Sequence, residues 1–367
     1  MPSLLQQYTQ KHAPFVLFGL RAFLNDQKKQ TAQVSPHLVE SIENITEFCL
    51  RGGKNMRGVL TVLGYRLARG EKDSIYRIAA AIEMFHKYIL SVDDMADRDE
   101  KRNGGSTLWK MYQDKFAQQK WADAAHHGRT FAEVDCCLMS SFVTELIRTA
   151  DFPAEKLLAV LQIVDSEMYL QTIAGWQIHY FQNNQKLAEA DEAEYLHGLE
   201  LVTAHYSFVA PLTIGAVLAT PKAGGQARAK QDSDLIKSLT EYGQNVGMAF
   251  QLQDDILGMF GDTKETGKPV GNDLREGKKT VLLQRAYCAA KEKDRKFLVK
   301  VCGQNFSAAD LNRVQKIMID TGALATTQKM AEDYAEDAIK KLTDLNQKQE
   351  EVQVLQGLAQ FVVARKK

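Results

Sequence analysis

The sequence predicts an all-α protein, and two properties of its 367 residues support this. Only 7 of them are proline, and long runs of Ala, Leu, Gln, Glu and Lys, which favour helices, recur along the chain. Alternation of apolar and polar residues, the pattern of a half-buried strand, is scarce, so no strand is needed. Because no long flexible linker divides the chain, we expect one domain over residues 1–367, built as a helical bundle.

The predicted helices follow one another between short breaks. Glycine, proline or clustered polar residues interrupt the apolar pattern and mark breaks at residues 52–53, 98–107, 151–153, 220–225 and 261–277. In chain order, helices are expected at residues 38–50, 56–69, 74–93, 129–149, 155–181, 192–219, 232–258, 279–291, 294–302, 308–319 and 324–341. The helices 74–93 and 232–258 both lead into acidic residues, and the bundle is expected to bring these two ends to one mouth.

Charge and cysteine content limit the partners and the compartment. Lys+Arg and Asp+Glu both number 46, so no global field attracts nucleic acid or an anionic membrane. Residues 1–13 mix Gln, Lys and His with apolar residues, so neither a signal peptide nor a stable membrane insertion is expected there. The cysteines form no CxxC pattern and are interpreted as reduced packing residues of a cytoplasmic protein; they are Cys49, Cys136, Cys137, Cys288 and Cys302.

Two aspartate clusters carry most of the functional information. Residues i and i+4 of a helix share a face, so Asp93 and Asp97 can point the same way, with Asp94 beside them. A second cluster, Asp254 and Asp255, also follows an apolar or neutral stretch. Carboxylates this close repel one another unless hard cations lie between them, and Mg²⁺ commonly bridges carboxylates to phosphate oxygens. A solvated acidic turn is the alternative for either cluster alone, but the pair predicts one metal-binding cavity for a phosphorylated substrate.

Basic residues in the loops beside these clusters match such a substrate. Arginine can bind a phosphate through two hydrogen bonds, and lysine adds a point charge. A glycine pair at residues 52–53 lets the backbone approach an anion before a helix N-terminus. A solvated surface charge is the alternative for each residue singly, whereas the set favours a diphosphate site; its members are Lys54, Arg57, Arg102, Lys268 and Lys278.

These residues lie in strings that resemble the trans-isoprenyl diphosphate synthases, which extend an allylic diphosphate with isopentenyl diphosphate. The resemblance covers residues 50–285 and leaves a helical C-terminal part, 286–367. It implies the isoprenoid synthase fold, a helical bundle around a deep apolar cavity. The matching strings are Gly52-Gly53-Lys54-Asn55-Met56-Arg57, Asp93-Asp94-Met95-Ala96-Asp97 with Arg102, Thr203-Ala204-His205-Tyr206-Ser207-Phe208, Phe250-Gln251-Leu252-Gln253-Asp254-Asp255, Gly267-Lys268-Pro269 and Asp273-Leu274-Arg275-Glu276-Gly277-Lys278-Lys279-Thr280.

The resemblance also implies roles for single residues. The chief ligands of three Mg²⁺ ions, with Mn²⁺ as an alternative metal, would be Asp93, Asp97 and Asp254, supported by Asp94 and Asp255. The allylic diphosphate would be held by Arg102, Lys268 and Lys278. The diphosphate of isopentenyl diphosphate would be held by Lys54, Arg57 and His86. The reacting carbons would be lined by Thr203 and Gln251.

The chemistry implied by the resemblance is ionisation, condensation and proton elimination. Metal and cations would stabilise the departing diphosphate, so that the allylic C–O bond breaks toward a carbocation inside an apolar cavity. The double bond of isopentenyl diphosphate would then attack, and the released diphosphate would accept the final proton. The expected primers are dimethylallyl, geranyl and farnesyl diphosphate, and the expected assembly is a homodimer with the apolar helix 129–149 at its contact.

Four positions depart from the pattern of the family. A second arginine is replaced by Asn103, a lysine by Val202, an acidic residue by His179 and a fifth-position acid by Gly258. A lost charged contact costs a few kcal/mol, which keeps a catalytically weak or regulatory subunit of a prenyltransferase heteromer as an alternative. A class I terpene cyclase is a further alternative, but it would leave the cations of the isopentenyl diphosphate site unused. Because the aspartates of both clusters are retained, we favour an active enzyme.

Product length in the family depends on side chains that precede the first cluster. One helical turn is about 5.4 Å, comparable to one isoprene unit, so a bulky residue one turn deeper permits one more condensation. The candidates here are Tyr88 and Ile89, five and four residues before Asp93, and Phe85 about a turn further down. This arrangement predicts geranylgeranyl diphosphate as the product, with farnesyl diphosphate as the alternative. The two aromatic side chains could equally be ordinary core packing.

Overall fold

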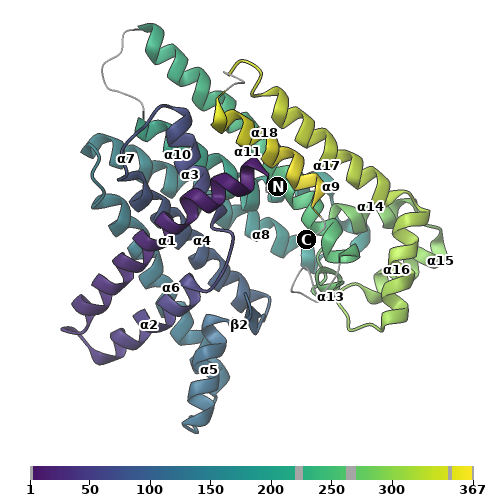
Figure 1. Ribbon diagram of the computed structural model, residues 1–367. Coiled ribbons are helices and arrows are strands. Elements are labelled where there is room, and N and C mark those ends of the chain that lie inside the picture. Colours follow the sequence, from purple (N-terminus) through teal and green to yellow (C-terminus); the bar gives the residue numbers. More distant parts are fainter. Residues whose placement is uncertain (1–2, 220–225, 262–269, 346–348, 366–367) are drawn as a thin grey trace. The chain divides into compact units, whose positions relative to one another are not determined.

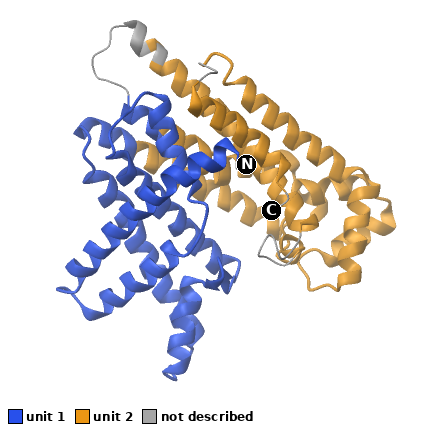
Figure 2. Ribbon diagram, in the orientation of Figure 1, with its two compact units in different colours: residues 1–161, 214–221 blue, residues 162–213, 222–367 orange. Residues whose placement is uncertain are grey.

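The computed structural model describes residues 3–219, 226–261, 270–345 and 349–365 (Figure 1). Nearly all of its regular structure is helical, as the sequence predicts. Its contacts divide the chain into two compact units (Figure 2). Unit 1 comprises residues 1–161 and 214–221, and unit 2 comprises residues 162–213 and 222–367. The single domain expected over the whole chain stays a prediction.

Unit 1 is built around one buried helix, α4. This helix packs against α1, α3 and α6, and the side chains of Ile78, Ala80 and Ile82 are completely buried. Every residue from Ile78 to Phe85 is buried, so α4 lies inside the core and carries the first aspartate cluster at its C-terminal end. The elements are α1 (Leu4–Thr31), α2 (Pro36–Leu50), α3 (Met56–Leu67), α4 (Ile75–Ala96), β1 (Lys101–Arg102), β2 (Gly105–Ser106), α5 (Leu108–Gln118), α6 (Ala124–Arg148), α7 (Ala154–Ile163) and, continuing a helix of unit 2, α10 (Ala210–Ala219).

Unit 2 is built around the long helix α11, which packs against η3, α17 and α18. A side chain at Gly247 would lie 2.5 Å from the Cα of Ala204, so α11 and η3 are in direct backbone contact there. Two segments, η1 and η3, are π-helical. The elements are η1 (Val164–Leu170), α8 (Gln171–Asn184), η2 (Leu187–Glu189), α9 (Glu192–Leu199), η3 (Glu200–Val209), α11 (Gln226–Phe260), α13 (Asn272–Arg275), α14 (Val281–Ala289), α15 (Glu292–Val301), α16 (Ala308–Asp320), α17 (Ala323–Lys340) and α18 (Glu350–Ala364).

Every helix expected from the sequence is confirmed, and four further α-helices of the described residues, α1, α5, α13 and α18, were not among those expected. Helix α1 contains Pro14 in its interior, which obscures the helical pattern. Helix α5 lies where no helix was expected. Helix α18 lies in the C-terminal part 286–367, which was expected to be helical, although no helix was placed beyond residue 341. The expectation that no strand is needed is wrong, because β1 and β2 form a short antiparallel hairpin. The break at 220–225 and residues 262–269 of the break at 261–277 lie outside the described residues.

One helical stretch of the described residues, Glu192–Ala219, is long and apolar enough to cross a membrane by composition. Its apolar window is 78% buried inside the protein. Burial of this extent is typical of a core helix in a globular protein. The close contact of η3 with α11 also indicates that this stretch packs inside the protein.

The packing of α5 on α6 buries a carboxyl group. Asp135 is 1% exposed and accepts a hydrogen bond of 2.6 Å from the Tyr112 hydroxyl. Burial raises the pKa of Asp135 from 3.8 to about 6, against the smaller opposing effect of the Tyr112 hydrogen bond. The folded state therefore binds this proton more tightly than the unfolded state, and the resulting stability is present below about pH 4 and lost as pH rises through 6.

We predict that Asp135→Asn removes this pH dependence. Two pKa units correspond to roughly 3 kcal/mol of unfolding free energy, lost by the wild type but not by the variant between pH 4 and 7. The free energy of unfolding of both proteins is measured in urea at pH 4 and at pH 7. The matched control is Asp165→Asn, at an exposed aspartate, which should keep the wild-type dependence. A variant at position 135 that also kept it would contradict the assignment.

Candidate active site

The first aspartate cluster occupies the C-terminal turn of α4. Asp93 and Asp94 lie in the helix, and Asp97 is the residue that caps it. The chain then turns through Arg98 at a φ of 57°, and the Asp99 N–H donates to the Asp94 carbonyl at 2.9 Å. This is the hydrogen bond of a helix C-terminal Schellman turn. The turn therefore places three carboxylates at the negative end of a helix dipole, where a cation is needed.

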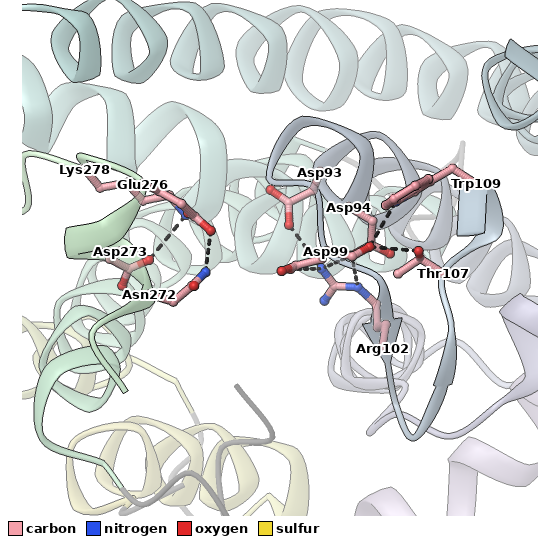
Figure 3. A network of polar contacts seen from close by, with 10 residues as sticks. All are labelled: Asp93, Asp94, Asp99, Arg102, Thr107, Trp109, Asn272, Asp273, Glu276 and Lys278. Carbon is pink, nitrogen blue, oxygen red and sulfur yellow. Dashed lines mark hydrogen bonds and ion pairs between the residues drawn. The ribbon is translucent and has the colours of Figure 1, made fainter. Parts of the chain in front are cut away.

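Arg102 supplies that cation. Its Nε donates to Asp94 Oδ1 at 2.6 Å and its Nη2 donates to Asp93 Oδ2 at 3.2 Å, as Figure 3 shows. Asp94 is completely buried, and burial raises its pKa to about 6 although the Arg102 hydrogen bond opposes the shift. The guanidinium that the resemblance assigns to an allylic diphosphate thus forms hydrogen bonds with two carboxylates. Its substrate role stays a prediction.

The hairpin that carries Arg102 explains one departure from the family pattern. Asn103 and Gly104 form its two-residue turn, with φ values of 49° and 79°. Asn-Gly is the pair that such left-handed hairpin turns favour, because most other residues are strained there. Arg51 fixes the hairpin by donating to the carbonyls of Arg102 and Ser106, at 3.2 and 2.7 Å. Asn103 therefore shapes a turn in place of the expected second cation.

The isopentenyl diphosphate residues expected from the resemblance meet within unit 1. Arg57 Nη1 on α3 donates to His86 Nε2 on α4 at 3.0 Å. Burial, and then the charge of Arg57, lowers the pKa of His86 well below its usual value, so the imidazole is neutral and can accept this hydrogen bond. Lys54 is exposed in the loop before α3. An exposed lysine therefore lies in the loop before the helix that carries the partly buried Arg57–His86 pair.

The residues expected to set product length also lie on α4. Phe85 is completely buried and Ile89 is 8% exposed. The rings of Phe85 and Tyr88 meet edge to face, with centroids 5.9 Å apart. They form one aromatic wall a turn or more before Asp93, which fits either a tunnel floor or core packing.

The second aspartate cluster lies on α11 in unit 2, and an arginine from the C-terminal end neutralises it. Arg365 Nη2 donates to Asp254 Oδ1 at 3.0 Å and to the Phe250 carbonyl at 2.9 Å. The guanidinium lies 4.0 Å from the centroid of the Phe250 ring, and its side chain is 7% exposed. The sequence offered no signal for this contact, because the two residues are 111 positions apart.

Asp255 is the buried member of this cluster. Its Oδ1 accepts from Gln251 Nε2 at 3.1 Å and its Oδ2 accepts from the Tyr195 hydroxyl at 3.4 Å. Burial, and then the nearby Asp273 carboxylate, raises its pKa well above the usual value. Thr203 on η3 donates to Gln251 Oε1 at 3.0 Å. The structure thus joins the predicted carbon-lining residues Thr203 and Gln251 to the predicted metal ligand in one hydrogen-bond network.

The carboxylate of Asp273 lies in the space beside Gly258, the fifth residue of the second cluster. A side chain at Gly258 would lie 2.5 Å from Asp273 Oδ2, so glycine leaves room for that acid. Lys278 Nζ lies 3.3 Å from Asp273 and 2.8 Å from Glu276 (Figure 3). Asp273 lay within a matching string but received no role from the sequence. Lys268, the remaining predicted cation, lies outside the described residues.

The other two departures, at Val202 and His179, lie in packed positions. A side chain at Gly175 would lie 2.6 Å from the Val202 nitrogen, so α8 and η3 touch backbone to backbone. His179 stacks on Tyr195 with ring centroids 4.6 Å apart, and its Nε2 donates to the Tyr195 carbonyl at 3.2 Å. Burial lowers the pKa of His179 to about 4, so the ring is neutral. Both residues contribute to helix packing within unit 2.

The acids present fit a magnesium site in chemistry. Carboxylate oxygens are the ligands that Mg²⁺ prefers, and Asp94 Oδ2 is buried without a hydrogen-bond partner in the described structure. No three acidic, histidine or cysteine side chains of the described residues are already gathered around one metal position. A cavity of about 540 Å³ in unit 2 is lined by residues of α14 and α17, not by an aspartate cluster. The apolar cavity expected beneath the clusters stays a prediction.

Comparison with known proteins agrees with this site. Residues 39–318 match the polyprenyl synthetase family. A geranylgeranyl diphosphate synthase of Saccharolobus solfataricus is 29% identical over 96% of this chain and 95% of its own length. A geranylfarnesyl diphosphate synthase of Aeropyrum pernix is 33% identical over 78% of this chain and 82% of its own. The crystal structure of a geranylgeranyl pyrophosphate synthase from Corynebacterium glutamicum, complexed with isoprenyl diphosphate and magnesium, has a TM-score of 0.88 and 25% identity, covering 98% of this chain and 99% of that one.

The fold and the site therefore define an isoprenoid synthase-type prenyltransferase. The chain belongs to the polyprenyl synthetase family, as the resemblance in its motifs predicts.

We predict that Arg102→Met destabilises the protein through Asp94. An unpaired buried carboxylate costs about 3 kcal/mol, measured as the free energy of unfolding in urea at neutral pH. Adding Asp94→Asn should recover most of the loss, because no buried charge then remains. The control Arg148→Met removes an exposed pair with Glu145 and should cost less than about 1 kcal/mol. Equal losses in the single and double variants would show that Arg102 acts through packing alone.

Proposed function

We propose that this prenyltransferase condenses isopentenyl diphosphate with allylic diphosphates and releases geranylgeranyl diphosphate. The single observation that carries the proposal is the Arg57–His86 contact, which lies apart from the carboxylates that Arg102 holds. A cyclase ionises one diphosphate and needs no second cationic site. The S. solfataricus relative and a 28% identical protein of Sulfolobus acidocaldarius, which covers 95% of this chain, are both named geranylgeranyl diphosphate synthases.

The proposed cofactor is Mg²⁺, three ions per site, with Mn²⁺ as an alternative. Bound metal would supply charge stabilisation for the departing diphosphate. The residues that would hold it are Asp93, Asp97 and Asp254, with Asp94 and Asp255 in support. Arg102 and Lys278 already pair with carboxylates, and phosphate oxygens would offer them equivalent acceptors. Thr203 and Gln251 would then face the reacting carbons from η3 and α11.

The proposed product length rests on the aromatic wall of α4. Phe85 is fixed by complete burial, and Tyr88 leans against it edge to face. A wall at this depth suits a C20 product, with a C15 product as the alternative. The proposed primers are dimethylallyl, geranyl and farnesyl diphosphate.

We also propose a cytoplasmic homodimer that binds no nucleic acid and inserts no helix stably into a membrane. Helix α6 exposes Phe131 and Val134, by 37% and 57%, which suits a contact between two copies. None of the five cysteines is in a disulfide, as expected in a reducing compartment. The formal net charge of zero gives no general attraction to nucleic acid.

One assay tests the proposed reaction. We expect no product from an allylic diphosphate alone, and a C20 diphosphate when isopentenyl diphosphate and Mg²⁺ are added, detected by mass spectrometry. Chelation with EDTA should abolish turnover, and added Mg²⁺ should restore it. Diphosphate release from the allylic substrate alone would indicate a cyclase. No turnover with either mixture would indicate a subunit that needs a partner.

A second prediction concerns Tyr88. Removing this ring should open the tunnel floor, so Tyr88→Ala should lengthen the main product by about one isoprene unit. Product lengths are compared by chromatography and mass spectrometry. The control is Tyr180→Ala, at a tyrosine 48% exposed on α8, which should leave the product unchanged. An unaltered product from the first variant would mean that Tyr88 is core packing only.

A further inference from the structure

Lys87, next to His86 on α4, is a buried cation to which the sequence assigned no role. The residue is 3% exposed. Its Nζ donates to the Gly52 carbonyl at a long 3.4 Å, and it also lies 3.4 Å from the position that a Cβ of Gly53 would occupy. Lysine is almost never fully buried without a partner, because an ammonium loses its hydration inside a protein.

A neighbouring carboxylate, Glu83, interacts with Lys87 electrostatically, but the two form no ion pair. Glu83, one turn earlier on α4, is also buried, and its Oε1 accepts the Gly58 N–H at 2.8 Å. No ion pair joins Lys87 to Glu83, or to any other acid in the described parts of the chain. An ammonium has three N–H donors, and the structure gives this one a single long hydrogen bond. The group is therefore positioned for an acceptor that the protein itself does not provide.

The surroundings of the ammonium suit an anion. The turn that it faces, Gly52-Gly53, has φ values of 64° and 104°, which glycine adopts without strain. The turn leads into the N-terminus of α3, whose capping residue Asn55 makes no side-chain hydrogen bond to the helix. The positive end of the α3 dipole favours an anion here, although the Glu83 side chain already accepts the Gly58 N–H. Asn55 Oδ1 is itself buried without a partner in the described structure.

The same turn borders the site of a missing charge. A side chain at Gly52 would lie 3.6 Å from the Cβ of Asn103, the hairpin residue that stands where a second arginine was expected. Lys87 and Asn103 thus approach one glycine pair, and Lys87 brings the positive charge that Asn103 lacks. Arg57 and His86 lie on the same two helices, α3 and α4.

We propose that Lys87 is a diphosphate-binding residue that grips isopentenyl diphosphate from the buried side of the Gly52-Gly53 turn. The inference rests on the proposed function, since it deepens the cationic site of Lys54, Arg57 and His86. Within the described residues Lys87 makes one long hydrogen bond, and diphosphate oxygens would complete the others. Lys87 therefore lowers the stability of the empty enzyme and raises its affinity for one of the two substrates.

The test is Lys87→Met, with binding of isopentenyl diphosphate measured by calorimetry in the presence of Mg²⁺. We expect affinity to fall by at least about tenfold, the loss typical of one charge-assisted contact. The KM for isopentenyl diphosphate should rise similarly, while the KM for the allylic primer stays within about twofold. The ligand-free melting temperature should stay equal or rise, because a buried charge is removed. Lys87→Arg should keep most of the affinity, and Lys101→Met, at an exposed lysine, should change neither quantity.

Wild-type affinity in Lys87→Met would overturn the inference, and so would an equal loss for both substrates or a fall in melting temperature that Lys87→Arg does not reverse. A failure of the proposed function looks different, because the wild type would then make no elongated product. Calorimetry of the unreacted complex still compares Lys87→Met with the wild type in that case. A wild type that bound no isopentenyl diphosphate would overturn both proposals.

Discussion

The structure depends on neutralising carboxylates that are placed where a negative charge is costly. The first cluster sits at the C-terminal end of α4, against the helix dipole, and one of its members is fully buried. Arg102 compensates it from a hairpin eight residues away, and Arg365 compensates the second cluster from the C-terminal end. These arginines offset part of the negative charge within each unit, which helps self-repelling acids to persist in a folded protein.

This requirement also accounts for residues that look like losses in the sequence. Asn103 permits the tight turn that aims Arg102, and Gly258 leaves room for the carboxylate of Asp273. Arg51 holds the same hairpin through two carbonyls. The departures at Asn103 and Gly258 change where the charged groups lie, but Arg102 and Asp273 keep charge near the two clusters. The turn at Asn103 and the space left for Asp273 at Gly258 explain these two departures without requiring a loss of activity.

The sequence predicted what is local and missed what depends on distance. Helix positions follow from periodicity over a dozen residues, so α2 to α4 and α14 to α17 were located well, whereas Pro14 hid α1. The aspartates and the Arg57–His86 pair follow from strings of fixed spacing. The hairpin was missed because its strands have two residues each, although Asn103-Gly104 is a recognised turn signal. Arg365 could not be found, because nothing in a sequence shows that residues 111 positions apart touch. The burial of Lys87 likewise depends on the fold of a glycine turn.

The π-helical segment η3 has a consequence for how this chain can vary. Thr203 lies in it, and its wide turns hold more residues than α-helical turns of the same height. If the rest of the helix kept its winding, deleting one residue between Thr203 and the end of η3 would rotate Thr203 by about 100° relative to everything that follows. Thr203 would then turn away from Gln251, with no change in either side chain. Insertions and deletions in this stretch are thus more damaging than point substitutions, and an alignment gap placed there would misassign the hydroxyl that contacts Gln251.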